Sequence, residues 1–592
     1  MIVPMIKYGL LVHHQDKDAF MDKLMDLGLV HIHTQQTEED ATTHELSSII
    51  RETEEAIRRF KQRKVKVLEY SPTETEPTLS EIGAMEKELE RTTNEVEALA
   101  IEIKLLKPWG NFNRTELKRL ETTTGFEVKF FEYPQRHFEQ KWLNQYHLQV
   151  VNKIGGNLYF IIFRKPGQEL PISPVALPEE SLDELIKLQH KAKEKVKHLN
   201  RKLDYYASSL SNVLNQRLAE AKDKLSYHLA NTSASAVHDG GLWLIEAWCP
   251  AEVEKKLILF LNRSQTVFVK SAPQPGEAPP VLLRNNSFAR LFEPIGALFS
   301  LPNYYELDLT VLFAPFFLLF FGLCLGDAGY GLIILVLATI LKLRVNQANR
   351  NYYTLGQLFG LATIVAGIVS GTFFGIELIN LPAATQLSSV FLNQDQLFNL
   401  ALAIGFIQII FGMGVQAYKQ WKFKGFVHSI SRIAWIILLL CLVDMYVMKL
   451  MPAITHVTLW VSLGGIVLFG APEKGWLKSL GMGLADLYNI TGVLGDLLSY
   501  IRLFALGVAS AILGLVVNSI ALSMKDVPYG GYILFIVVLL IGHTINFLLS
   551  TLSAFVHPMR LTFVEFYKNS GFIGGGKPFR AFRKQSIHSV KT

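Results

Sequence analysis

The sequence predicts an α-helical membrane domain of about eight transmembrane helices, preceded by a cytoplasmic arm made of an antiparallel coiled coil with small α/β lobes. Half of the 592 residues are hydrophobic and only 19% are charged. The charges are unevenly distributed along the chain. The residues before Leu307 include 39 Lys and Arg and 42 Asp and Glu, whereas those after it include only 19 Lys and Arg and 10 Asp and Glu. Apolar runs in the second half are long enough to cross a bilayer, which excludes a purely soluble or a disordered chain.

Two polar segments of the first half, 45–106 and 181–229, predict the coiled coil. In the second segment apolar side chains recur at gaps of three and four, at Leu185, Leu188, Ala192, Val196, Leu199, Leu203, Tyr206, Leu210 and Val213. Helices this polar need a partner to bury such a stripe, so the two segments are predicted to pair as antiparallel arms. Two separate surface helices are the alternative.

Strand-like and helical patterns around these arms predict the α/β lobes. The strand-like runs are VKFFEY, YHLQVV, LYFIIF, LWLIEAW and TVFVK, and helical patterns lie around Lys17–Leu27 and Glu252–Leu261. We therefore predict a cytoplasmic arm at 1–270, a Pro-rich linker and membrane approach at 271–306, and a transmembrane domain with a C-terminal tail at 307–592. The start of the sequence lacks a signal-peptide pattern, so the arm is expected in the cytoplasm.

The predicted membrane helices are Leu309–Leu325, Ala328–Leu343, Leu355–Ile379, Leu397–Tyr418, Ile430–Leu450, Val457–Ala471, Leu487–Leu522 and Tyr532–Val564. Alternate loops differ in charge: one set carries nine basic residues, Lys342, Arg344, Arg350, Lys419, Lys422, Lys424, Arg432, Lys474 and Lys478, and the other only Lys449 and Lys525. The positive-inside rule and an even helix count then put both termini in the cytoplasm.

Arg502 is the first candidate functional residue, because it lies near the middle of the seventh predicted helix. An Arg at that depth costs roughly 2.5 to 3.5 kcal/mol even on the most lenient scale. A structural ion pair is the alternative explanation. Small residues at helical spacing around it would let another helix approach closely, namely Gly492, Gly495, Ser499, Ala505 and Ala509.

The eighth predicted helix carries a second candidate site. Six polar residues recur along it at intervals of three or four, His543, Asn546, Ser550, Ser553, His557 and Arg560, which favours a hydrated path or buried network. Other acids expected at membrane depth are Asp327, Glu377, Asp444 and Asp496. A direct Asp496–Arg502 pair is not expected, because the two lie ~9 Å apart along the helix axis.

Several other chemistries are excluded by the motifs present. The three cysteines, Cys249, Cys324 and Cys441, have no paired spacing, which argues against disulfides and a Cys-based metal site. GFIGGGKP matches GxxxxGK, but Pro578 replaces the hydroxyl residue and the motif follows a membrane helix. We therefore predict no bound nucleotide, nucleic acid, metal or cofactor, and no catalytic residues.

The segments SYIRLFALG, HPMRLTFVEFY and GGGKPFRAF resemble subunit a of V/A-type rotary ATPases, called subunit I in prokaryotes. NNSFARLFEPIGALFSLPNYYELDLT, LGDAGYG, SGTFFG, LKPWGNF and the opening MIVPMIKYGLLVHH resemble the same family, so the similarity covers nearly the whole chain. It implies a static membrane subunit beside a rotating ring of proteolipid subunits. Peripheral stalks would hold the arm and connect it indirectly to the catalytic ATPase head.

The resemblance also implies roles for individual residues. Arg502 corresponds to the essential translocation Arg and Arg560 to its partner. His543, Asn546, Ser550, Ser553 and His557 would line the outer half channel with Glu377 and Asp444, while Asp496, Glu306 and Asp308 would face the inner one. Some eukaryotic members have Glu in place of Ser550 and His in place of Ser510, so their proton relay does not transfer to this chain.

The expected function is ion translocation coupled to ATP hydrolysis or synthesis, with a prokaryotic plasma membrane favoured. The sequence leaves open H⁺ or Na⁺, the main direction and the number of ring subunits. Two other functions remain at this point: a self-contained secondary transporter, for which an inverted repeat is expected, and a non-conducting scaffold whose functional part is the coiled coil.

Overall fold

The structure is a computed structural model that describes residues 1–585 except 34–39, 64–77, 140, 166–171, 238–240, 275, 346, 379–390, 450–451, 471–475, 526 and 529. It divides into two compact units. The membrane unit consists of Met1–Val12, Leu29–Ile32 and Leu244–Ala581, and the arm unit of His13–Gly28, His33–Trp243 and the residues after Ala581. The domain boundaries predicted near 270 and 306 stay predictions.

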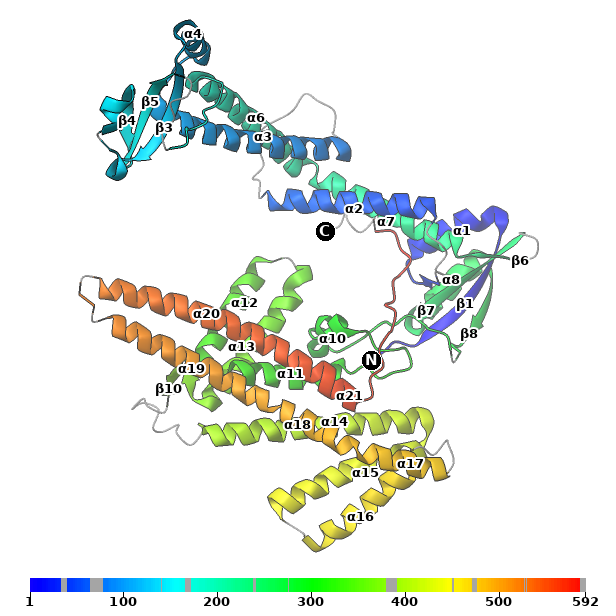
Figure 1. Ribbon diagram of the computed structural model, residues 1–592. Coiled ribbons are helices and arrows are strands. Elements are labelled where there is room, and N and C mark those ends of the chain that lie inside the picture. Colours follow the sequence, from blue (N-terminus) through cyan, green and yellow to red (C-terminus); the bar gives the residue numbers. More distant parts are fainter. Residues whose placement is uncertain are drawn as a thin grey trace. The chain divides into compact units, whose positions relative to one another are not determined.

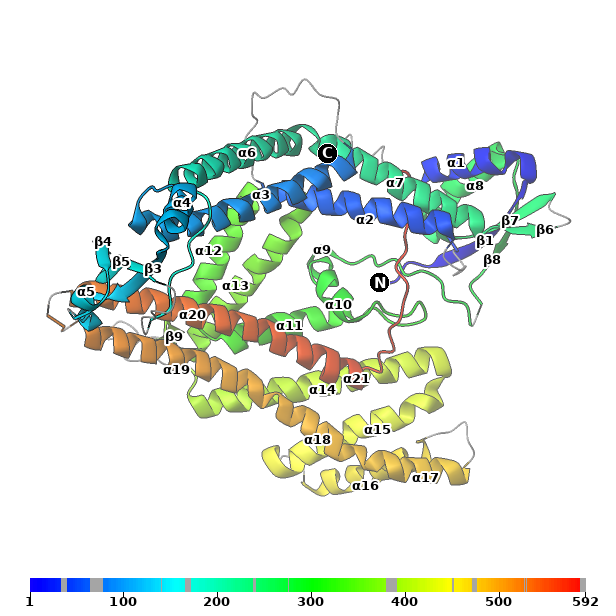
Figure 2. The ribbon, with the colours of Figure 1, turned by 45° about the horizontal axis from the view of Figure 1, so that its top comes forward.

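Long helices form most of the arm unit: α1 (Lys17–Leu27), α2 (Ala41–Gln62), α3 (Leu79–Leu106), α6 (Leu182–Ser209) and α7 (Ser211–Thr232). Helix α3 packs on α6 and α2 packs on α7, as Figures 1 and 2 show. This reversed pairing order confirms the predicted antiparallel coiled coil. Capping boxes start two of the helices, Thr78 with Glu81 at α3 and Ser181 with Glu184 at α6.

An α/β lobe lies in the segment between α3 and α6. It contains α4 (Arg114–Thr124), β3 (Glu127–Pro134), α5 (Lys141–Gln145), β4 (Leu148–Ile154) and β5 (Asn157–Arg164). The sheet is antiparallel with the order β3-β5-β4. Phe130 packs with Trp109 on one face, whereas Phe131 and Phe160 stack on the other. A short strand, β6 (Ser235–Val237), follows α7.

A second sheet belongs to the membrane unit and confirms the strand-like runs near 242 and 266. Its main path runs in the order β2-β7-β1-β8 through β1 (Met5–His13), β2 (His31–Ile32), β7 (Leu242–Pro250) and β8 (Val267–Ser271), and β6 pairs with β7 off this path. Helix α8 (Glu254–Arg263) lies between β7 and β8 in the sequence. The pairs β1–β8 and β2–β7 are antiparallel. The sequence analysis did not identify β1 as a strand.

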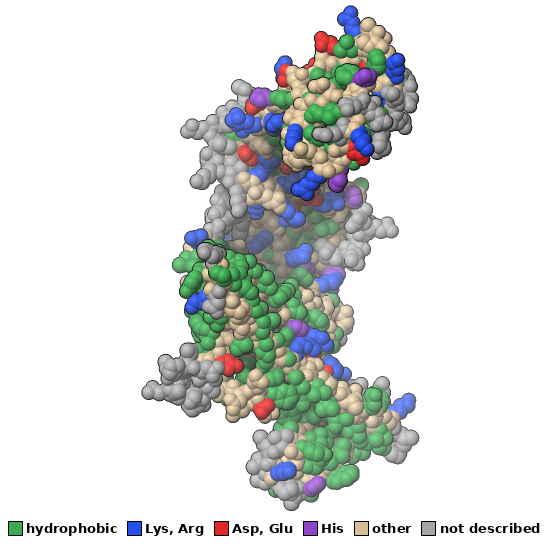
Figure 3. Space-filling view, turned by 60° about the vertical axis from the view of Figure 1, so that its left-hand side comes forward, with side chains coloured by type: hydrophobic (Ala, Val, Ile, Leu, Met, Phe, Trp, Pro, Cys, Tyr) green, Lys and Arg blue, Asp and Glu red, His purple; other side chains and the backbone are tan. Residues whose placement is uncertain are grey.

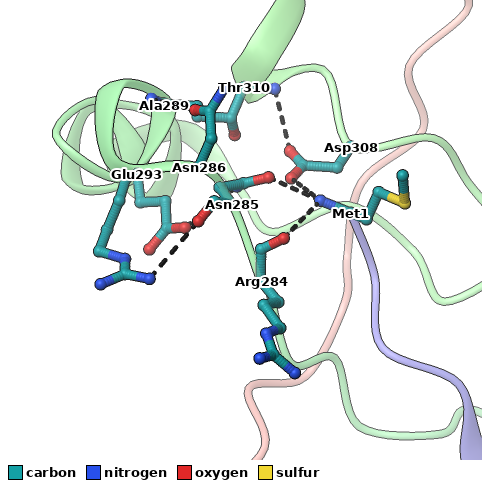
Figure 4. Close-up of polar contacts among 9 residues, drawn as sticks. Met1, Arg284, Asn285, Asn286, Ala289, Glu293, Asp308 and Thr310 are labelled. Atoms are coloured by element: carbon teal, nitrogen blue, oxygen red, sulfur yellow. Dashed lines mark hydrogen bonds and ion pairs between the residues drawn. The ribbon is translucent and has the colours of Figure 1, made fainter.

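The predicted linker contains ordered structure close to the membrane helices. Helices α9 (Ser287–Arg290) and α10 (Glu293–Phe299) lie in it. The Met1 ammonium donates hydrogen bonds to Asn285 Oδ1 at 2.6 Å and Asp308 Oδ2 at 3.2 Å, as Figure 4 shows. Asp308 also accepts the backbone N–H of Thr310 at 2.9 Å. These contacts fix the chain where the first membrane helix begins.

The helices of the membrane unit are α11 (Thr310–Leu325), α12 (Ala328–Arg344), α13 (Arg350–Ser370), α14 (Gln394–Lys424), α15 (Phe426–Val443), α16 (Pro452–Leu468), α17 (Trp476–Leu487), α18 (Asn489–Ser499), α19 (Ile501–Met524), α20 (Gly531–Arg560) and α21 (Tyr567–Asn569). The π-helices η8 (Asp444–Met448) and η10 (Leu561–Phe566) follow α15 and α20. A two-residue hairpin, β9 (Thr372–Phe373) and β10 (Ile376–Glu377), follows α13.

Five helical stretches of the described chain have the length and composition to cross a bilayer, and they are Arg350–Ser370, Gln394–Lys424, Phe426–Tyr446, Lys478–Met524 and Gly531–Asn569. Thr310–Leu325 and Ile454–Leu468 are shorter apolar helices. The predicted count of eight is therefore not confirmed, and the predicted ends Ile379, Leu450 and Ala471 fall outside the described residues. Hydrophobic side chains dominate much of the helical surface seen in Figure 3.

Candidate ion-translocation site

Arg502 lies in the first turn of α19, within the helical stretch Lys478–Met524 that contains the predicted seventh helix. Only Tyr500 separates α18 from α19, and its backbone keeps right-handed helical angles. The Tyr500 ring is fully buried, and its hydroxyl donates to Gln408 Oε1 of α14 at 2.6 Å. One terminal guanidinium nitrogen of Arg502 is buried, and none of the described residues gives it a hydrogen-bond partner. A buried N–H group that makes no hydrogen bond costs free energy, so this nitrogen needs an acceptor that the described residues do not supply.

The small-residue face around Arg502 is not covered by the described part of this chain. Ala505 and Ala509 are exposed, and a methyl group added at Gly495 would meet no atom within 4 Å. The same addition at Gly492 would meet only the Lys568 side chain, at 3.8 Å. The packing expected of this face is therefore not made inside the described chain.

The polar stripe of α20 separates into a bonded half and an open half. In the bonded half, Tyr330 Oη lies 2.8 Å from His543 Nδ1 and accepts from Asn546 Nδ2 at 2.9 Å. His543 Nε2 lies 3.0 Å from Asn518 Oδ1. Ser550 donates to Asn546 Oδ1 at 3.0 Å.

The hydrogen-bond directions in this half are mutually consistent with a neutral imidazole. Asn518 donates its amide N–H to Phe374 O at 2.8 Å, so its oxygen faces His543 and the Nε2 atom must donate. Nδ1 is then free to accept from the Tyr330 hydroxyl. The bonded half is thus a closed network rather than an open row of groups.

The open half consists of Ser553, His557 and Arg560. The Nδ1 atom of His557 is buried and has no hydrogen-bond partner among the described residues, and Arg560 is exposed. The charges of Arg502 and Arg560 both act on His557. This part of α20 therefore has unused polar groups next to the two arginines.

Asp327, expected at membrane depth, and the two acids expected in the outer half channel lie in separate places. Asp327 is fully buried, and its carboxylate accepts N–H groups of Gly329, Tyr330, Phe374 and Gly375 at 2.8–3.1 Å, so it fixes the start of α12. Asp444 accepts from Thr455 at 2.5 Å in the α15–α16 hairpin.

Glu377 lines a cavity of about 220 Å³. Its walls come from α11, α13, α14 and α19 and include Leu503 and Gly507, close in sequence to Arg502. The polar residues that line the cavity include Ser370, Thr372, Asn393 and Gln394. The structure therefore puts Glu377 with α19 but does not bring it together with His543 or Asp444.

The acids expected in the inner half channel differ in how they are bonded. Both oxygens of Asp496 accept from Lys568 Nζ at 3.1 Å, and Oδ2 also accepts from Asn569. Glu306 accepts from Lys419 Nζ at 2.5 Å and from the N–H groups of Ile573 and Gly574 at 2.9 Å. Asp308 is bonded to Met1 and Thr310. Glu306 and Asp308 therefore each connect segments that are distant in the sequence.

Sequence reasoning did not select Tyr330, Asn518, Gln408 or Glu565. Two of these residues could have been selected from the sequence. Asn518 is a polar residue in an apolar helix, and Glu565 lies only five residues after Arg560. Among the described residues no group of three or more His, Cys, Asp and Glu side chains is arranged to hold a metal ion. The expected absence of metal and cofactor stays a prediction.

Comparison with known proteins gives consistent matches. The V-type ATPase 116kDa subunit family matches residues 174–365. A-type ATP synthase subunit I of Methanocaldococcus jannaschii is 31% identical over 58% of this chain and 55% of its own length. V-type ATP synthase subunit I of Borreliella burgdorferi is 24% identical over 99% of this chain and 100% of its own length.

A crystal structure of the cytoplasmic N-terminal domain of subunit I, homolog of subunit a, of V-ATPase matches 45% of this chain and 100% of its own, with 14% identity and a TM-score of 0.21. In the archaeal match the chain spans about half the length of the relative, whereas in the spirochaete match both proteins align from end to end. Together these matches support a V/A-type ATPase subunit a, named subunit I in these relatives, as the family to which this chain is similar.

Proposed function

We propose that this chain is the static, non-catalytic subunit through which a rotary ATPase moves H⁺ or Na⁺ across the membrane. It would lie beside a ring of proteolipid subunits, each with one ion-carrying carboxylate, and form two half channels against that ring. The observation that carries this proposal is the buried, unpartnered guanidinium nitrogen of Arg502, next to a helix face that the described chain leaves open.

The chemistry of Arg explains its proposed role. A guanidinium stays charged at any physiological pH and binds carboxylates through charge-assisted hydrogen bonds. It would therefore stabilise the ring carboxylate in its ionised form, and only a neutralised carboxyl would move on toward lipid. Because one elementary charge crossing 100 mV exchanges ~2.3 kcal/mol, several ions would move per ATP.

The half channels are assigned from the positions of the polar groups. We place Ser553, His557 and Glu377 on the outer path, with the His543–Asn546–Ser550 network as its far wall. Asp496 and Lys568 would mark the inner side. Asp444 on the outer side, and Glu306 and Asp308 on the inner side, would have a structural role there, because Thr455, Lys419 and Thr310 respectively engage their carboxylates.

The cellular setting completes the proposal. The arm would bind peripheral stalk subunits and connect indirectly to the catalytic head, with both termini in the cytoplasm of a prokaryote and the helices in its plasma membrane. ATP hydrolysis or synthesis would take place on other subunits, so this chain would bind neither nucleotide nor nucleic acid.

The test compares ATP-driven ion uptake by inverted membrane vesicles that carry the native chain or the Arg502→Gln variant. Both must first be shown to copurify with the ring and catalytic subunits. Arg344→Gln is a matched control, because Arg344 is exposed in the last turn of α12. We expect Arg502→Gln to abolish uptake and Arg344→Gln to preserve it.

Two results would contradict the proposal. Undiminished uptake by an assembled Arg502→Gln complex would favour a scaffold. Uptake by a chain that copurifies with no ATPase subunits would favour a self-contained transporter.

A further inference from the structure

A buried carboxyl group lies in the π-helix that directly follows Arg560. Glu565 is only 2% exposed, and its Oε2 atom has no hydrogen-bond partner in the part of the chain that the structure describes. Thr562, one turn earlier, is fully buried, and its hydroxyl oxygen also has no partner. Buried polar atoms in proteins are almost always bonded, and π-helical turns occur frequently at functional sites. The exception at Glu565 therefore points to a role beyond packing.

The neighbours of Glu565 form a graded series from the surface inward. Lys568 has a side chain 58% exposed and bonds Asp496, whose side chain is 12% exposed. Asn569 donates from the same amide nitrogen to Asp496 Oδ2 at 3.1 Å and to the backbone oxygen of Glu565 at 2.7 Å. Asp496 and Glu565 are thus joined through one bridging side chain.

On its other side Glu565 lies within the electrostatic reach of the translocation arginines. The charges of Arg560, Asp496 and Arg502 all act on its carboxyl group. The two guanidinium groups favour the ionised form of the Glu565 carboxyl group, which is the form able to take up a cation, whereas burial and the Asp496 charge favour its neutral form. Lys568, Asp496 and Glu565 are therefore connected through hydrogen bonds that include Asn569. Glu565 also interacts electrostatically with Arg502.

We propose that Glu565 is a proton-accepting residue of the inner half channel, between Asp496 and Arg502. This inference rests on the proposed function. In the pumping direction, Glu565 Oε2 takes a proton from a hydronium ion that passes Asp496, which forms an O–H bond and leaves water. That bond then breaks as the proton passes to the ring carboxylate leaving Arg502, and the Glu565 carboxylate is restored.

A proton fits this position better than Na⁺. A single open carboxylate oxygen is sufficient to hold a proton, whereas a hard metal cation requires several oxygen ligands around it. Two neighbouring guanidinium groups would in addition repel a resident metal cation. The ligand chemistry assigned to Glu565 is therefore that of an acid–base group.

The test measures initial rates of ATP-driven proton uptake in Na⁺-free inverted vesicles that contain the assembled complex. We expect Glu565→Gln to lower the rate by about tenfold or more, since a positioned acid–base group contributes at least that much. Glu565→Asp keeps a carboxyl group and should retain more of the rate, with a displaced pH profile. Asp395→Asn is the matched control, because Asp395 is an exposed acid at the start of α14.

Each outcome separates this inference from the proposed function. A Glu565→Gln rate equal to the native rate between about pH 6 and 8 would overturn the role of Glu565, and so would native uptake that requires Na⁺. If Glu565→Gln does not assemble, Glu565→Asp decides: a displaced pH profile supports the role, and an unchanged profile refutes it. Full uptake by Arg502→Gln would overturn the proposed function itself.

Discussion

At the residue scale, Glu306 connects three segments that are far apart in the sequence. Its carboxylate accepts from Lys419 of α14, from the N–H groups of Ile573 and Gly574 in the C-terminal segment, and from Asn303 at 3.1 Å. Burial raises the pKa of Glu306, but the hydrogen bonds from these groups outweigh burial and hold that pKa below its ordinary value. The carboxylate is therefore a structural anion.

This depressed pKa makes the contribution of Glu306 to stability depend on pH. A group with a lowered folded-state pKa stabilises the protein fully above its ordinary value, about 4.3, and loses that contribution as the pH falls through the folded-state pKa. We expect Glu306→Gln to reduce the free energy of unfolding by about 2 to 3 kcal/mol near neutral pH. The difference from the native protein should shrink on acidification.

Unfolding of the detergent-solubilised native and Glu306→Gln proteins across the acidic range measures this difference. Asp395→Asn serves as the control, because Asp395 is exposed, and its small effect should not change with pH in the same way. A Glu306→Gln effect that is constant from neutral to strongly acidic pH would contradict the assignment.

At this scale, the sequence predicted only those parts of the candidate site whose residues lie on a single helix. Spacing within the eighth helix was enough to select His543, Asn546 and Ser550, which do bond into one network. Tyr330 lies 213 residues from His543 in the sequence, so no local pattern could pair them. The lack of a partner for Glu565 is likewise visible only once α14, α18 and η10 are folded together.

At the element scale, α12 and α13 pack with their backbones close together at glycine positions. A methyl group added at Gly360 of α13 would lie 2.7 Å from Leu335 N and 2.9 Å from Gly331 O of α12. These neighbours are backbone atoms, which cannot move aside as a flexible side chain can. Small residues of this kind are how membrane helices pack when no hydrophobic effect drives them together.

Gly360→Ala is therefore expected to destabilise the membrane unit by about 1 to 3 kcal/mol, because it forces α12 and α13 apart. Gly414→Ala in α14 is the matched control, since a methyl group there would meet no atom within 4 Å. It should be neutral or raise stability by up to about 1 kcal/mol through helix propensity. Thermal unfolding of both purified variants in one detergent compares them, and equal melting temperatures would refute the close packing.

The seventh predicted helix, Leu487–Leu522, lies within one helical stretch, Lys478–Met524, so its hydrophobic pattern was sufficient to locate it. The pattern could not predict how Tyr500 packs. A methyl group added at Gly405 of α14 would lie 2.3 Å from the Tyr500 ring. This contact joins two helices that are far apart in the sequence, so only the tertiary structure reveals it.

At the scale of the whole molecule, periodicity predicted both the coiled coil and the helical membrane part. Its limits were the helix ends and short elements: the predicted count of eight spans was not confirmed, and β1 was not identified. Strand β1 pairs with β8, some 260 residues later, so its partner could not be read locally. The charges of the loops can be compared only over the entire chain. They give the remaining prediction, which is the orientation of the protein in the membrane.

The excess of basic residues in alternate loops, nine against two, predicts that Lys422 faces the cytoplasm and Lys525 the opposite side. Lys422→Cys and Lys525→Cys variants test this, because both lysines are exposed and the three native cysteines are buried. In inverted vesicles, whose cytoplasmic face is outside, a membrane-impermeant maleimide should label the variant at 422 and not the one at 525. In right-side-out vesicles the labelling should reverse.

Detergent-opened vesicles should label both variants, which confirms that each thiol is reactive. The reverse pattern in sealed inverted vesicles would refute the orientation. It would also put Asp496, Glu565 and the arm on the side away from ATP, and the proposed inner half channel would then have to be an outer one. The orientation therefore decides which side of the membrane supplies the proton that Glu565 is proposed to accept.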